Sequence, residues 1–335
     1  MFFTNPDNAD MKIELKKIVN PSIGLIFLYV IIGTLIWGIT YVGAFFHCET
    51  GFNDVLFKLP DTDFLWKNIV SFVFTVLNSI LLSHLINRFS FVSSRTFLPV
   101  FIFSLLIAVW EPAHIMYQSH IALMLFIVAL FQFFNMYHDR AAMEKAFLGS
   151  LLIAASSLLI NDLIFVIPVC WLGFLVLRSL SYRTFLASTI GAVVPWIIYA
   201  AIRYFISPDI VFADLFNLTF SLGFSMEGLQ LPTKIYIGLL LAIFLITLIG
   251  TYADFRRNGS ITRKNINFIL TLLIYFVVVF FFQDSFNGTV FPFIALCFAI
   301  FISNVFSTKQ TNFYSILFIV FLVLNMAFVV YNFMW

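Results

Sequence analysis

The chain has 335 residues, of which 62% are apolar and only 10% are charged, and its mean hydropathy is +1.04. Soluble domains carry about 25% charged residues, so this composition excludes an ordinary soluble protein and indicates an integral membrane protein. The net charge of +2, without a long basic face, also excludes nucleic acid as a partner.

About eleven apolar segments follow one another along the chain, with an expected range of about nine to twelve. No soluble domain interrupts them, so residues 1–335 are predicted to form one all-α domain, a polytopic transmembrane helix bundle. The third and fifth segments are shorter than the roughly 20 residues of a full span, which leaves thin spans or buried half-helices open there. The segments cover approximately residues 23–46, 66–86, 97–109, 121–137, the two arms of a hairpin at 151–183, 184–205, 235–252, 266–282, 290–306 and 313–333.

The distribution of charge predicts how these segments are oriented. Lys12, Lys16 and Lys17 precede the first segment, which predicts a cytoplasmic N-terminal segment at residues 1–20, because Lys and Arg accumulate in short inner loops. If the segments alternate, the inner loops receive 14 of the 18 Lys and Arg, and the C-terminus lies outside. The four cations on the outer side are Lys58, Lys67, Arg203 and Lys234.

The hairpin at residues 151–183 shows this polarity most clearly. Its two apolar arms meet at Asn161-Asp162, on the predicted outer side, and its inner end carries Arg178 and Arg183. The next segment contains Pro195, which predicts a kink. Residues 206–233 then form the longest outer loop, and part of it is amphipathic enough to lie as an interfacial helix.

Ionisable residues collect at the outer ends of the segments. Ionisable groups at membrane depth usually face protein or water, so helix packing could bring these residues into one outward-facing pocket. Each could equally mark a solvated turn. Arg203 is the natural cation of the group and could hold a phosphate or carboxylate, or extend to the interface. The candidate outer-face cluster is Glu111, His114, Asp162, Arg203 and Asp284, with His120 beside it.

The second segment carries another polar set, formed by Asn78, Ser83, His84 and Asn87. The pairs Ser83–Asn87 and His84–Asn87 are spaced so that they share a helix face, which makes this an intramembrane polar face or a set of interhelical hydrogen bonds. The three cysteines, Cys48, Cys170 and Cys297, show no metal-binding spacing. No nucleotide, zinc-hydrolase or serine-hydrolase motif occurs, so neither a cofactor nor a metal is predicted.

Residues 78–204 resemble a family of uncharacterised multi-pass membrane proteins typical of the Bacteroidetes. The likeness rests on the Asn-rich second segment, on Arg-Thr-Phe-Leu-Pro at residues 95–99, and on Trp171, Arg178 and Arg183. The resemblance implies the inner membrane of a bacterium with two membranes, and it assigns no residue a role.

Two classes of function remain open. The first is a non-catalytic component of the cell envelope, either a carrier for a lipid or small solute or an assembly scaffold. Its partners would be the lipid bilayer and an envelope assembly. The alternative is an enzyme, a polyprenyl-phosphate-dependent glycosyltransferase or glycan polymerase that uses an outward-facing acid/Arg pocket on a lipid-linked substrate. A carrier needs polar groups near mid-membrane, whereas the enzyme needs the acids and Arg203 to converge.

Overall fold

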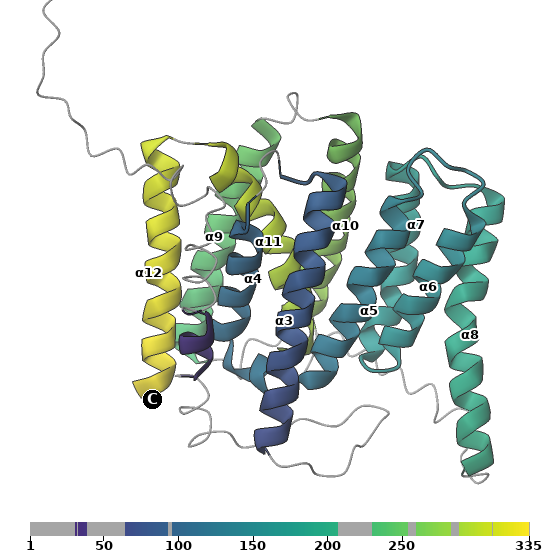
Figure 1. Cartoon of the computed structure of the whole chain (residues 1–335), viewed down its shortest axis with the longest axis horizontal. Helices are drawn as coiled ribbons and strands as arrows, with labels where there is room; N and C mark the ends of the chain where they lie inside the picture. The colour runs from purple at the N-terminus through teal and green to yellow at the C-terminus, as the bar shows by residue number, and fades with distance from the viewer. Residues whose placement is uncertain are drawn as a thin grey trace, which may run out of the picture.

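A computed structural model describes residues 31, 33–38, 64–92, 96–206, 230–253, 259–282, 288–309 and 311–334 of the chain. All regular structure within these ranges is helical, and the helices form one bundle (Figure 1). Residues 33–38 are a helical part of the first apolar segment. The remaining elements are α3 (Phe64–Phe89), α4 (Leu98–Val109), η1 (Glu111–His114), α5 (Tyr117–Phe134), α6 (Met143–Ser157), η2 (Asn161–Phe165), α7 (Val166–Val176), α8 (Tyr182–Ile206), α9 (Leu231–Ala253), α10 (Ser260–Phe282), η4 (Gly288–Val290), α11 (Phe291–Thr308) and α12 (Asn312–Met334).

Within the described ranges, seven helices are long and apolar enough to cross a membrane, namely α3, α5, α8, α9, α10, α11 and α12. The prediction of an all-α, multi-pass membrane protein is therefore confirmed. Segment boundaries are close to those predicted for α9 to α12. The prediction was less accurate for the fifth segment, because α6 begins at Met143 and includes Glu144 and Lys145. The apolar pattern begins only after these polar residues of the first turn, so it does not indicate where α6 starts.

Three apolar stretches are too short to span a bilayer on their own. Helix α4 has 12 residues and α7 has 11, which correspond to about 18 and 17 Å at 1.5 Å per residue, against about 30 Å of hydrocarbon. The 15-residue α6 is about 23 Å long. Helix α4 lies in the core, since ten of its residues are buried. Backbone that breaks inside a membrane is tolerated where protein surrounds it.

The three short 3₁₀ helices occupy equivalent places. η1 joins α4 to α5, η2 joins α6 to α7, and η4 joins α10 to α11. The helices alternate in direction, so all three lie at the lower end of the bundle in Figure 1. These are the polar turns that the sequence places on the outer side.

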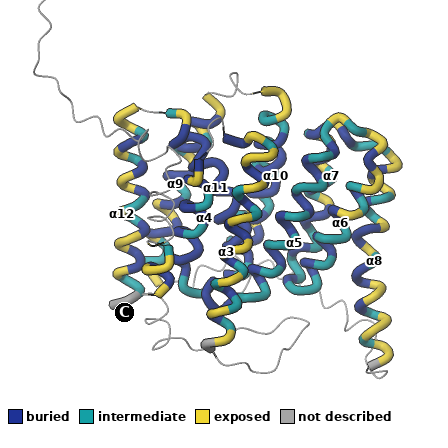
Figure 2. The backbone as a smooth tube through the Cα atoms, viewed as in Figure 1, coloured by how far each residue is buried: buried dark blue, intermediate teal, exposed yellow. Residues whose placement is uncertain are grey.

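Helix α11 is the centre of the bundle. In its most apolar stretch of 18 residues, 94% of the residues are buried, and the helix packs on α4, α9 and α10 (Figure 2). Helix α11 carries no charged residue, and the hydroxyls of its buried Ser303 and Ser307 donate to carbonyls of the same helix, so other helices can enclose it. Close packing also requires glycine where α8 crosses α6, because a Cβ on Gly191 would lie 2.4 Å from the carbonyl oxygen of Phe147. Helix α8 continues through Pro195 as one helix.

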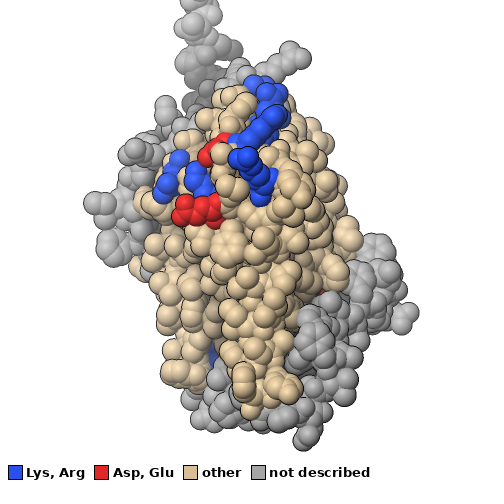
Figure 3. All heavy atoms as spheres, turned by 90° about the vertical axis from the view of Figure 1, so that its right-hand side faces the viewer, with Lys and Arg blue, Asp and Glu red and all other residues tan. Residues whose placement is uncertain are grey.

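Lys and Arg divide unequally between the two ends of the bundle. In Figure 3, which shows the α8 side, they gather at the upper end above an uncharged flank. The upper end carries Arg88, Arg140, Lys145, Arg178, Arg183, Arg263, Lys264 and Lys309, and the lower end carries Lys67, Arg203 and Lys234.

A candidate polar site inside the bundle

Helix α3 turns its polar side inward. Its outward side carries apolar residues such as Ile69 and Ile80, which are 54% and 60% exposed. Its inward side carries polar residues at spacings of three or four, which is the repeat of one helix face. These are Asn68, Ser71, Thr75, Asn78 and Ser79, all of them buried. Such a pattern would be unstable in water, and it fits a helix whose outer side contacts lipid while its polar side faces other helices.

The inward face of α3 meets the break between α4 and α5. His120, on the first turn of α5, has its Nδ1 3.4 Å from the hydroxyl of Thr75. The Asn78 side-chain amide donates to the backbone oxygen of His120 at 2.9 Å. Higher up, the hydroxyls of Ser79 and Ser104 lie 3.1 Å apart and tie α3 to α4. The polar face is therefore an interhelical site, not an isolated stripe.

Two histidines satisfy the backbone where the helices break. The last carbonyls of a helix lack partners within it. His114 Nε2 donates to the oxygen of Ala108 at 3.1 Å, and His120 Nε2 donates to the oxygen of Ala113 at 2.8 Å. A carbonyl only accepts, so each Nε2 carries the hydrogen and the neutral ring leaves Nδ1 as an acceptor. The histidines thus cap α4 and η1 within protein.

Trp37, from the first apolar segment, closes this region. Its indole stacks on His114 with ring centroids 3.9 Å apart, and its Nε1 donates to Asn68 Oδ1 at 3.1 Å. His114 is completely buried, and desolvation lowers its pKa to about 3. His114 is therefore uncharged at neutral pH. We call Trp37, Asn68, Ser71, Thr75, Asn78, Ser79, Ser104, His114 and His120 the inner polar cluster.

Several atoms of the inner polar cluster keep unused hydrogen-bonding capacity. Within the described ranges, Asn68 Nδ2, Ser71 Oγ and Asn78 Oδ1 are buried and have no hydrogen-bond partner. An unsatisfied buried polar atom costs about 1–3 kcal/mol, and most buried groups in proteins avoid this. The set comprises one amide donor, one hydroxyl and one amide acceptor, and it carries no charge. Its chemistry suits an uncharged ligand with both donor and acceptor groups.

No protein-family model matches the chain, and no curated protein or solved structure matches it either. The chemistry of the inner polar cluster is therefore inferred from its own side chains.

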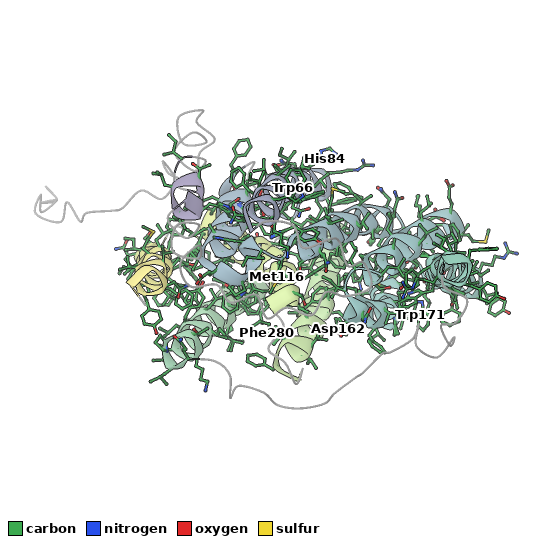
Figure 4. All side chains as sticks on the ribbon, turned by 90° about the horizontal axis from the view of Figure 1, so that it is seen from below. Trp66, His84, Met116, Asp162, Trp171 and Phe280 are labelled. Atoms are coloured by element: carbon green, nitrogen blue, oxygen red, sulfur yellow. The ribbon has the colours of Figure 1, made fainter. Side chains whose placement is uncertain are left out.

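The polar face predicted on the second segment is divided by the structure. Ser83 and Asn87 do share a face, since Asn87 Nδ2 donates to Ser83 Oγ at 3.4 Å. Asn78 lies elsewhere, buried against α5, whereas His84 and Asn87 are exposed. Figure 4 shows His84 at the rim of the bundle. The four residues do not form one site, because Asn78 lies about 120° around the helix from His84 at 100° per residue.

The residues predicted for the outer-face cluster are distributed over several elements. Glu111 and His114 lie on η1, and Asp162 lies on η2, where its backbone oxygen accepts from the hydroxyl of Tyr275. Arg203 lies in the last turn of α8, and Asp284 is outside the described residues. Among the described members, His114 belongs to the inner polar cluster, and so does the neighbouring His120.

The expected ion pair of Arg203 is not found with Glu111 or Asp162. In the described part of the chain, Arg203 forms no ion pair, and its buried Nε has no hydrogen-bond partner. The reason is topological: α8 packs mainly on α6 at the side of the bundle, whereas η1 contacts α3, α4, α5 and η4. Pairing with Asp284 remains a prediction.

Sequence reasoning did not identify Trp37, Ser104, Asn68, Ser71 and Thr75 as site residues. For the last three a signal was available, since polar residues at positions 68, 71, 75, 78 and 79 repeat with the period of a helix. For Trp37 there was none, because its role depends on where the first segment packs.

Proposed function

We propose that the chain is a multi-pass inner-membrane protein that serves the cell envelope without catalysing a reaction, as a carrier of a small, uncharged polar solute. The inner polar cluster carries this proposal. Polar groups at membrane depth are costly, and they usually mark a solute path where they face the interior of a bundle. Helices that break at such a site are a recurrent feature of carriers. A scaffold would need its distinctive polar groups on the outside instead.

The chemistry of the cluster supports an uncharged solute. Its polar atoms belong to amides, hydroxyls, an indole and two imidazoles, and burial keeps His114 neutral. An ion would have to leave water for a site without an opposite charge, which costs far more than transferring a neutral amide or hydroxyl. Asn68 Nδ2 and Asn78 Oδ1 lie about 15 Å apart along α3 at 1.5 Å per residue, so a solute with both donors and acceptors would bond to them in turn along the helix.

The proposed topology has about eleven spans, with the N-terminus inside and the C-terminus outside. Besides the seven long helices, α4, α6, α7 and the segment around residues 33–38 would supply the rest. The gathering of Lys and Arg at the upper end of the bundle (Figure 3) supports assigning that end to the cytoplasm. The resemblance to bacteroidete membrane proteins supports the inner membrane.

Glycerol and urea test the carrier proposal, because each combines hydrogen-bond donors with acceptors. Liposomes with and without the full-length protein are mixed with a gradient of either solute, and their re-swelling is followed by stopped-flow light scattering. We expect faster re-swelling with the wild-type protein than with empty liposomes, and a loss of the gain in Asn78→Leu. Asn87→Leu is the matched control, since Asn87 is exposed on the same helix. Equal rates for wild-type and empty liposomes with both solutes would refute the proposal.

A further inference from the structure

At the upper end of the bundle, the loop between α5 and α6 contacts the loop between α7 and α8. The backbone N–H of His138 donates to the oxygen of Leu177 at 3.2 Å. The hydroxyl of Ser181 donates to the oxygen of Arg140 at 2.8 Å. Arg140 and Ser181 are 41 residues apart in sequence, and their two loops are thereby held together as one surface.

This surface presents three arginines, Arg140, Arg178 and Arg183, all exposed. Of the charged neighbours, Asp139 lies 3.9 Å from Lys145. In the described part of the chain none of the three arginines forms an ion pair. Arg183 also lies in the first turn of α8, a turn without an acidic residue. The N-terminus of a helix carries partial positive charge, so a cation there is unfavourable unless an anion is bound.

Two residues of these loops have a strained backbone conformation. Arg178 has a φ of 58° and His138 a φ of 60°. Glycine is the residue that adopts this left-handed conformation without strain, and a helix end such as that of α7 commonly uses it. Arg178 therefore holds its cation at a position where glycine would favour folding, and strain of this kind indicates a functional use of the side chain.

The start of α8 is also rigid. The backbone N–H of Ser181 donates to Thr184 Oγ1 at 2.8 Å, and the N–H of Thr184 donates to Ser181 Oγ at 3.2 Å. This reciprocal cap fixes the first turn that carries Arg183. An anion that binds here would meet groups already in place.

An apolar surface lies directly below the arginines. On α7, Leu172 and Leu175 are 55% and 57% exposed, one to two turns before Arg178. On α8, Leu186 is also exposed, one turn after Arg183. Figure 3 shows the same arrangement on this side of the molecule, with cations above an uncharged flank. A ligand that fits both parts has an anionic head and apolar tails.

We propose that the surface formed by Arg140, Arg178 and Arg183, with Leu172, Leu175 and Leu186 below it, binds an anionic phospholipid. The arginines hold the phosphate of the headgroup, for which their planar forks are suited, and the leucines contact the acyl chains. In the proposed topology this lipid belongs to the inner leaflet. The lipid site does not depend on the carrier function, and either can fail without the other.

Lipid binding is measured by native mass spectrometry of the full-length protein in a non-ionic detergent. Separate titrations use dioleoyl-phosphatidylglycerol and dioleoyl-phosphatidylcholine, and a third adds inorganic phosphate to the phosphatidylglycerol complex. We expect phosphatidylglycerol to bind more tightly than phosphatidylcholine. Each cation near an anionic headgroup contributes about a fivefold gain in affinity, so Arg178→Gly should lose about fivefold. Arg178→Gly combined with Arg140→Gln and Arg183→Gln should lose about a hundredfold.

Two control variants separate the site from general effects of charge and of folding. His138→Gly relieves the same backbone strain without removing a permanent charge, and Lys234→Gln removes a cation from the opposite end; neither should change phosphatidylglycerol binding. Arg178→Gly should unfold at a higher temperature than the wild type while it binds lipid more weakly. Equal binding of both lipids, wild-type affinity in the triple variant, or full displacement by inorganic phosphate would each overturn the assignment.

Discussion

Replacing His114 with alanine is the most direct test of how the buried end of α4 is stabilised. In the structure, His114 donates to the oxygen of Ala108 at 3.1 Å and stacks on Trp37 with ring centroids 3.9 Å apart. His114→Ala removes both interactions at once. It leaves the Ala108 carbonyl unsatisfied at the end of a helix whose residues are almost all buried.

The expected loss follows from these two interactions. A buried carbonyl left without a partner costs about 1–3 kcal/mol. The ring stacking contributes about 0.5–1.5 kcal/mol beyond the area it buries. Together they predict that His114→Ala lowers the free energy of unfolding by about 2–4 kcal/mol. That is far above the roughly 0.5 kcal/mol typical of surface substitutions.

The measurement is thermal and denaturant unfolding of the full-length protein in detergent, followed by tryptophan fluorescence. His84→Ala is the matched control, because His84 is exposed on α3 at the rim of the bundle. His114→Gln is a second control, because glutamine keeps a side-chain N–H donor. We expect His114→Gln to retain more stability than His114→Ala and His84→Ala to resemble the wild type. If His114→Ala unfolds with the wild-type midpoint, the proposed capping of α4 is wrong.

The remaining predictions concern pH, packing, charge and topology. The folded-state pKa of His114, about 3, lies below its ordinary value of 6.5. Because the unfolded state takes up the proton more readily, acidification from pH 7 to pH 5 should lower the free energy of unfolding by about 2 kcal/mol through His114 alone. His114→Gln should therefore lose about 2 kcal/mol less than the wild type on acidification, measured by fluorescence-monitored unfolding. Gly191→Ala should destabilise by about 1–3 kcal/mol because its Cβ would collide with Phe147 backbone; wild-type thermal stability would contradict this packing. Arg203→Gln should cost under about 1 kcal/mol, whereas loss of a buried ion pair would cost about 3–5 kcal/mol in the same unfolding assay. A reporter that is active only after export should be active when fused after Trp335. Activity of a cytoplasm-only reporter at the same position would contradict the topology.

Much of the fold follows from local sequence. A helix in lipid must satisfy its backbone within itself, so a long apolar stretch becomes a helix almost regardless of its neighbours. This is why the predicted starts and ends of α11 and α12 lie within a few residues of the observed ones. Charges mark the ends of such helices for the same reason, since they are least costly at the interface. The polar turns became η1, η2 and η4 because breaks in the helices need polar or protein surroundings.

Which side of each helix faces the protein interior was decided only by the tertiary structure. In water an apolar stripe marks the inner side of a helix, but lipid and protein interior are both apolar, so leucine or phenylalanine indicates neither. Polar residues on α3 point inward because there they meet His120 and Ser104. Asn78 and His84 lie on different sides of α3 because they are about 120° apart around the helix. Arg203 lies away from η1 because α8 packs on α6. These arrangements depend on which helices become neighbours, and that is a property of the whole chain.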